Sequence, residues 1–187
     1  MVSGATGLPV LTVWRKRVYE RTCDTIGQVA IWATFCPLSS TLINNRTPMP
    51  PQLELAASLH VDLAPPLRIG EMPGGFREVI PILGGLVEGK LAGWVLAGGA
   101  DWCLTRADGI AEVWARYTIE TADGALISIL NSGLATKQPD GSWTGHTTPS
   151  FEVEAEGYQW LRKSLFVGTL RAEPDGTRVH LEFFRVV

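Results

Sequence analysis

Cysteine and histidine are both scarce in this sequence of 187 residues. The three cysteines, Cys23, Cys36 and Cys103, are odd in number and widely spaced, so they do not suggest the framework of a disulfide-stabilised domain. We therefore expect reduced thiols, as in a cytoplasmic protein. The three histidines lie far apart along the chain, and no cysteine–histidine pair has the spacing of a zinc site. The sequence predicts no metal site.

The sequence also lacks an excess of positive charge and any long apolar run. Its net charge is −3 at pH 7, whereas a nucleic-acid-binding surface needs clustered lysine and arginine to replace counterions. No apolar run reaches the roughly 18 residues of a membrane-spanning helix. We expect a cytoplasmic protein that binds neither nucleic acid nor membranes.

Sequence motifs for nucleotide, flavin and calcium binding are missing as well. There is no Walker loop, no dinucleotide-binding glycine fingerprint, no serine nucleophile elbow and no EF-hand pattern. We therefore predict chemistry without a cofactor. The reactions that remain are isomerisation, cyclisation, elimination, addition, or hydrolysis by a water that a carboxylate activates.

The first 50 residues differ in composition from the rest. They carry five basic side chains against two acidic ones, and the proline-rich stretch RTPMPPQ marks their end. They show no sustained strand alternation, so we expect residues 1–50 to form a poorly ordered extension and residues 51–187 to form the domain. An arginine-containing segment poor in acidic residues also resembles a transit peptide. A start codon assigned upstream of Met49 is a further alternative.

Glycine and proline are plentiful, with 20 and 12 residues, which favours turns over helices. From residue 52 on, short segments alternate between apolar and polar residues, as half-buried strands do. The clearest is AEVWARYTIET, residues 111–121. The turns ADG, ADG and PDG supply the glycine that tight hairpins need. After the strand ALISILNS, residues 125–132, we expect a polar loop and then a closing hairpin.

Many short antiparallel strands avoid exposed edges most simply by closing into a barrel. A barrel of about eight strands has a lumen wide enough for side chains or one small ligand. We predict an all-β fold, a small antiparallel β-barrel of about eight or more strands with an internal cavity. A β-sandwich is the alternative.

Several motifs in this body resemble the DUF3237 family, also called UPF0311. They are GGADW at residues 98–102, the Arg-Tyr pair at 116–117, the Phe-Glu step at 151–152, and Tyr-x-Trp-Leu at 158–161 ahead of Phe-Val-Gly. The resemblance covers residues 52–187. It implies a small β-barrel and allows a homodimer, but it implies little about a reaction, because the family name records an unknown function.

The same motifs carry side chains that a barrel does not need for folding. As catalytic groups we predict Asp101 or Glu152 as general acid or base, with Arg116 or Arg77 stabilising a developing anion. As substrate-binding residues we predict Arg77, Trp102, Trp114, Tyr117, Tyr158 and Trp160. Each also has a structural interpretation. Asp101 would cap a turn, Arg116 and Glu152 would lie on an outer strand face, and the aromatic residues would only pack.

Arg116 and Tyr117 are adjacent, so in a regular strand only one of them faces the lumen. We expect Arg116 inside, because Trp114 shares its face and would line a cavity. Asp101 is expected to be a lumen group, since the glycines before it can make the turn without its side chain. Burial beside tryptophan would then raise its pKa into a useful range.

Two functions fit these features. The first is a cofactor-independent enzyme that acts by acid–base chemistry on a small apolar or oxygenated metabolite, as an isomerase, cyclase or lyase. The second is a non-catalytic barrel that binds or carries a small molecule. A structural protein with a filled lumen fits the sequence as well as the carrier does.

Overall fold

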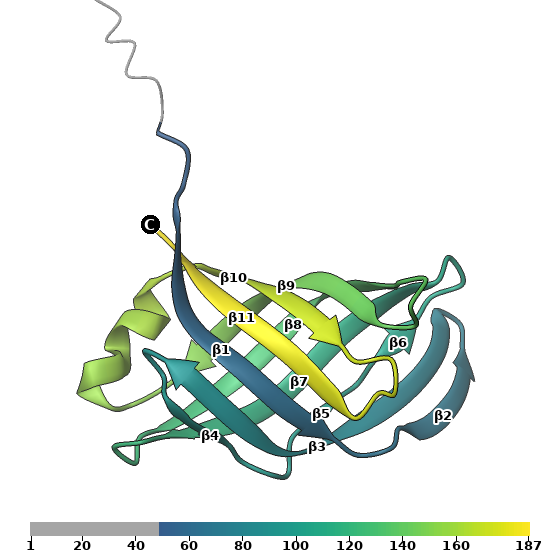
Figure 1. Cartoon of the computed structure of the whole chain (residues 1–187), viewed down its shortest axis with the longest axis horizontal. Coiled ribbons are helices and arrows are strands. Elements are labelled where there is room, and N and C mark those ends of the chain that lie inside the picture. The colour runs from purple at the N-terminus through teal and green to yellow at the C-terminus, as the bar shows by residue number, and fades with distance from the viewer. Residues whose placement is uncertain (1–48) are drawn as a thin grey trace, which may run out of the picture. The chain divides into compact units, whose positions relative to one another are not determined.

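The computed structural model describes residues 49–187, so residues 1–48 of the predicted extension lie outside the described residues. The described part contains eleven strands and one short 3-10 helix, in the order β1 to β9, η1, β10 and β11 (Figure 1). Their bounds are β1 Leu53–Leu63, β2 Leu67–Met72, β3 Gly75–Gly89, β4 Gly93–Val95, β5 Ala100–Asp101, β6 Leu104–Thr105, β7 Ile110–Thr121, β8 Leu126–Lys137, β9 Trp143–Glu152, η1 Glu156–Lys163, β10 Phe166–Ala172 and β11 Arg178–Val186.

The strands form a closed antiparallel barrel. Neighbouring strands follow the order β1, β11, β10, β9, β8, β7, β4, β3, and β1 also pairs with β3, which closes the sheet. The short strands β4, β5 and β6 all lie between β3 and β7 and together fill one position of the barrel. Eight positions result, and β2 is an additional strand that forms a hairpin with the start of β3. The predicted β-barrel is confirmed.

Alternation along the strands decides which side chains fill the barrel. In β7, Val113, Ala115, Tyr117 and Ile119 are buried, whereas Glu112, Trp114, Arg116 and Glu120 lie on the outer face. The expectation that Arg116 faces the lumen is therefore wrong. Turning that face inward would bury two glutamates and an arginine together, which is far more costly than burying an apolar face.

The two ends of the barrel are filled differently. The end beside η1 is packed by Phe151, Phe166 and Phe183, whose ring centroids lie 4.9 and 5.9 Å apart in the two contacts that Phe151 makes. Leu161 of η1 is buried in the same apolar cluster. Toward the end formed by the β10–β11 turn, the inward positions carry small residues instead, among them Ala111, Ala115, Ala135 and Ala172. Small side chains there leave space inside the barrel.

Leu53 and Leu55 are exposed at the start of β1, where a register shift after Leu55 interrupts the pairing with β11. The structure departs from the sequence-based expectations at one further place, after residue 132. The segment expected as a polar loop contains the end of β8 and the whole of β9, whose inward residues include Thr147 and Phe151. Threonine residues on both faces hide this strand from a search for apolar alternation. In residues 49–187, no helix has the length and apolar character needed to cross a membrane.

Candidate functional site

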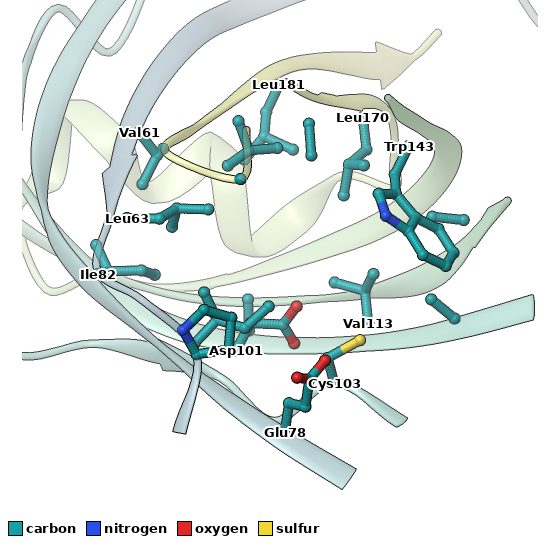
Figure 2. Close-up of a pocket in the computed structure, with 18 of the residues that line it drawn as sticks. Val61, Leu63, Glu78, Ile82, Asp101, Cys103, Val113, Trp143, Leu170 and Leu181 are labelled. Atoms are coloured by element: carbon teal, nitrogen blue, oxygen red, sulfur yellow. The ribbon is translucent and has the colours of Figure 1, made fainter. Parts of the chain in front are cut away.

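The barrel encloses a cavity of about 220 Å³ at the end away from η1. Figure 2 shows apolar side chains such as Leu170, Leu181 and Val61 on one side of it, and the side chains of Asp101, Cys103 and Glu78 on the other. The turn between β10 and β11 contributes Pro174 and Gly176 to its lining. The cavity is therefore a largely apolar chamber with polar groups gathered on part of its wall, which is the usual composition of a small-molecule site.

Asp101 lies on the cavity wall, in the two-residue strand β5. Gly98 adopts a positive φ of 108°, and a Cβ on Gly99 would come within 2.5 Å of the Tyr117 Cβ. These glycines let the chain turn and approach β7 closely. The Asp101 Oδ1 accepts a hydrogen bond from the Trp114 backbone N–H at 2.8 Å. Asp101 is thus a cavity group that also satisfies a backbone donor of β7, and this donor does not belong to the turn that Asp101 was alternatively expected to cap.

Burial raises the pKa of Asp101 to about 6, while the hydrogen bond from Trp114 and the charge of Arg77 act in the opposite direction. An acid with a pKa near 6 holds both protonation states in useful amounts near neutral pH. The side chain can therefore both give and take a proton under these conditions.

Two other polar groups of the cavity lack a hydrogen-bond partner within residues 49–187. They are the Tyr117 hydroxyl and Asn131 Oδ1, on residues that are only 4% and 1% exposed. Burial and the nearby Asp101 raise the pKa of Tyr117, so its hydroxyl stays protonated and remains a donor. Buried polar groups are nearly always paired in folded proteins, and an unpaired one costs roughly 1–3 kcal/mol. Two such groups in one cavity indicate a place for a ligand.

The strand register places Asp101 and Asn131 on either side of Ala115. Asp101 of β5 is the partner of Ala115 in β7, and Ala115 is the partner of Asn131 in β8. Strands are spaced by roughly 4.8 Å, so the two Cα atoms are about 10 Å apart along this row. Since Ala115 carries only a methyl group, the space between the carboxyl and the amide is open to a ligand.

The remaining ionisable groups in the lining are acidic or neutral. Glu78 and Glu173 line the cavity, and no lysine or arginine of residues 49–187 does so. Burial, together with the charges of Asp101 and Glu78, raises the pKa of Cys103 to about 12, so this thiol stays protonated and is a poor nucleophile. In the described part of the chain, no three histidine, cysteine, aspartate or glutamate side chains are placed to hold a metal ion.

Five of the other predicted site residues lie on the outer surface. Arg116 and Glu152 form an exposed ion pair at 3.2 Å. Trp102 and Trp114 are exposed and pack edge to face with ring centroids 5.5 Å apart, and the Arg77 guanidinium donates to the Trp102 carbonyl. None of the five lines the cavity, so the predicted arginine clamp for an anion is not inside the barrel.

Tyr158 and Trp160 belong to η1, at the end of the barrel away from the cavity. The Tyr158 hydroxyl donates to Asp123 Oδ1 at 2.9 Å, in the turn between β7 and β8. Trp160 packs against Phe166, and the side chains of Lys90 and Arg185 lie over its ring. These contacts hold η1 on the barrel, and the structure does not bring either residue to Asp101.

Sequence reasoning overlooked Asn131 and Glu78. Asn131 continues the inward positions of Ile127 and Ile129 in β8, and Glu78 continues those of Ile82 and Ile80 in β3. A polar residue in phase with inward isoleucines was the available signal. It is weak in a single sequence, because such a residue at the end of a strand is equally well placed in solvent.

Comparison with known proteins places these features in a family. The family model "Protein of unknown function (DUF3237)" matches residues 51–186. A UPF0311 protein of Rhodopseudomonas palustris is 36% identical over 132 residues, which cover 63% of this chain and 85% of that protein. The hydroalkoxylation enzyme phnH of Penicillium herquei is 25% identical over 122 residues, covering 65% of this chain and 76% of that enzyme.

Solved structures agree with the fold. A β-barrel-like protein from Acinetobacter baumannii has a TM-score of 0.69 and 32% identity, covering 76% of this chain and 99% of that one. An enzyme from Penicillium herquei has a TM-score of 0.59 and 25% identity, covering 75% of this chain and 97% of that one. The barrel that encloses the cavity therefore has relatives of known structure. The chain belongs to the DUF3237 (UPF0311) family.

Proposed function

We propose that this protein is an enzyme that uses Asp101 as a general acid and base on a small molecule held in the barrel. The observation that carries the proposal is the Asp101 carboxyl in the cavity wall, with its pKa raised to about 6 by burial. A carboxyl that only capped a turn would have no need of an adjoining apolar chamber. Perturbed acids in clefts are frequent at active sites.

The reaction class follows from this single acid and from the relative in Penicillium herquei whose name specifies hydroalkoxylation. Hydroalkoxylation adds a hydroxyl across a carbon–carbon double bond. Protonated Asp101 gives its proton to one alkene carbon while the hydroxyl oxygen bonds to the other carbon. The hydroxyl proton then passes to the Asp101 carboxylate, which restores the acid. Within one molecule this is a cyclisation without change in atoms or electrons.

The apolar part of the lining supports this chemistry. Val113, Leu170 and Leu181 cover much of the chamber, and few polar groups compete there for the substrate. Excluding water would protect a developing positive charge on carbon from capture by solvent. The cyclase form of the predicted enzyme is therefore the one that the cavity fits best.

The test is the conversion of 2-allylphenol, which carries a hydroxyl and a double bond, in deuterated water. The wild-type protein should form the cyclic ether with deuterium on the carbon that accepted the proton, measured by NMR and mass spectrometry. Asp101→Asn should lower the rate by about 10²-fold or more, because the amide cannot exchange a proton in this way. Full activity of Asp101→Asn would refute the catalytic role.

Glu152→Gln is the matched control, because Glu152 is a carboxylate on the outer surface. Its rate should equal that of the wild-type protein. The carrier function makes a different prediction, since the apolar cavity alone would suffice for binding. A wild-type protein that binds 2-allylphenol and returns it unchanged would favour the carrier.

A further inference from the structure

The charges around the cavity restrict what it can bind. Asp101, Glu78 and Glu173 all line it, and no lysine or arginine among residues 49–187 does so. Glu78 is paired with Arg68 at 3.4 Å and Glu173 with His180 at 2.9 Å, so the basic groups nearby are already engaged by carboxylates. The arginine whose charge acts on Asp101 is Arg77, and its guanidinium donates to the Trp102 carbonyl. An anionic ligand would lose its hydration shell here without gaining a counter-charge, and it would face carboxylates at close range.

The volume of the cavity restricts the size of its ligand. An engineered apolar cavity of about 150 Å³ holds benzene. On that scale the cavity of about 220 Å³ has room for about nine non-hydrogen atoms. This corresponds to one six-membered ring with a short substituent.

The unpartnered Tyr117 hydroxyl and Asn131 Oδ1 restrict which hydrogen-bonding groups the ligand can carry. Tyr117 pairs with Ile129 in the β7–β8 ladder, and Ala115 pairs with Asn131, so Tyr117 and Asn131 are diagonal neighbours on the inner face. Such neighbours are about 7–8 Å apart, which long side chains can span through one shared group. The Tyr117 hydroxyl needs an acceptor and Asn131 Oδ1 needs a donor. A single hydroxyl group meets both needs, whereas an ether or a ketone meets only the first.

We propose that the cavity selects an uncharged molecule of one ring, or of similar size, whose hydroxyl accepts from Tyr117 and donates to Asn131. This assignment rests on the proposed function only in that both concern the same cavity. It concerns recognition alone, however, and holds for a carrier as well.

Four probes of about nine non-hydrogen atoms each test the assignment by isothermal titration calorimetry at pH 7.5. 4-Ethylphenol has the hydroxyl, and its isomer 4-methylanisole accepts but does not donate. Propylbenzene does neither, and benzoate is anionic. We expect 4-ethylphenol to bind at least about fivefold more tightly than 4-methylanisole and propylbenzene. Benzoate should bind at least about tenfold more weakly than 4-ethylphenol.

Variants identify the groups responsible. Asn131→Leu should abolish the preference for 4-ethylphenol over 4-methylanisole, because only donation to Asn131 Oδ1 distinguishes these two probes. Tyr117→Phe should weaken the binding of both, because both accept from the Tyr117 hydroxyl. Thr147→Val is the matched control, because the Thr147 hydroxyl is also buried and lacks a partner within residues 49–187, but it does not line the cavity. Its binding profile should equal that of the wild-type protein. Should either cavity variant fail to fold, the order of the four probes with the wild-type protein still decides.

Equal affinity for all neutral probes, tight binding of benzoate, or no binding of 4-ethylphenol at millimolar concentration would overturn the assignment. These results are distinct from a failure of the proposed reaction. Asp101→Asn without loss of activity, or 2-allylphenol bound and unchanged, would refute the catalytic function while leaving the order of the probes intact.

Discussion

His180 Nδ1 lies 2.7 Å from His60 Nδ1, across the paired strands β11 and β1. His180 Nε2 in turn lies 2.9 Å from Glu173 Oε1, so that nitrogen carries a proton and donates to the carboxylate. A neutral imidazole has only one N–H. When both rings are neutral, His180 Nδ1 is therefore the acceptor and His60 Nδ1 is the donor.

This relationship gives a prediction about tautomers. At pH 8.5, ¹⁵N NMR should find His180 protonated at Nε2 and His60 protonated at Nδ1. The two rings would then be different tautomers, with Glu173 selecting that of His180 and His180 selecting that of His60. Glu173→Gln should weaken the preference at His180, because the amide is a poorer acceptor than the carboxylate. His180 protonated at Nδ1 in the wild-type protein would contradict the arrangement.

The raised pKa of Asp101 predicts a pH-dependent stability. Burial lifts this pKa from 3.8 to about 6 in the folded state, so the folded protein binds the proton more tightly than the unfolded chain does. Between about pH 4 and pH 6 the folded state thus holds more protons, and the Asp101 contribution to stability falls as pH rises. Above that window the ionised carboxyl costs up to about 3 kcal/mol.

Asp101→Asn removes this cost, because the amide stays neutral and its oxygen can still accept from the Trp114 N–H. The variant should therefore be more stable than the wild-type protein, and the difference between their free energies of unfolding should grow with pH. We expect it to be near zero at pH 4 and to reach a plateau above pH 7. Denaturation in urea at several pH values measures it. Glu152→Gln is the control, and a similar rise there would count against Asp101 as the source.

Ala115→Leu should fill the cavity between Asp101 and Asn131. We expect the affinity for 4-ethylphenol to fall by about tenfold or more, while the free energy of unfolding changes by less than about 1.5 kcal/mol, since the added methyl groups enter existing space. Ala57→Leu is the comparison, because Ala57 is fully buried within the apolar cluster. It should cost about 1–3 kcal/mol. An Ala115→Leu protein with unchanged affinity would place the ligand elsewhere.

The ion pair of Arg116 and Glu152 is expected to matter little. Its side chains are 50% and 72% exposed, and exposed pairs contribute about 0–1 kcal/mol. Arg116→Gln should leave both the melting temperature and the conversion of 2-allylphenol nearly unchanged. A large loss of activity with a normal melting temperature would restore the catalytic role first predicted for Arg116.

A chain that begins at Met49 should fold with nearly the stability of the full sequence. The strands of residues 49–187 lie between Leu53 and Val186 and already include the β1–β3 pairing that closes the barrel. Thermal unfolding of the two chains compares them directly. A loss of several kcal/mol would show that residues 1–48 stabilise the barrel.

Local patterns were enough to predict the barrel and most of its strands. AEVWARYTIET alternates so regularly that its two faces can be assigned by reading, and the turns around Asp108, Asp123 and Asp175 separate consecutive strands. Alternation of period two follows directly from strand geometry, so it is visible without any knowledge of the partners. Alternation fits a sandwich as well as a barrel, and the closed form was favoured because closure leaves no exposed strand edges.

Only the tertiary structure decided which face of each strand turned inward. It also decided which side chains lie next to one another inside the barrel. The choice between Arg116 and Tyr117 depended on the summed cost of burying one whole face or the other, to which Glu112 and Glu120 contributed. Asp101, Tyr117 and Asn131 converge because β5, β7 and β8 are neighbours in the closed sheet. The sequence by itself determined the strands and their two faces, since these depend on neighbouring residues. The cavity and its unpaired polar groups depend on contacts between distant segments, which only closure of the barrel creates.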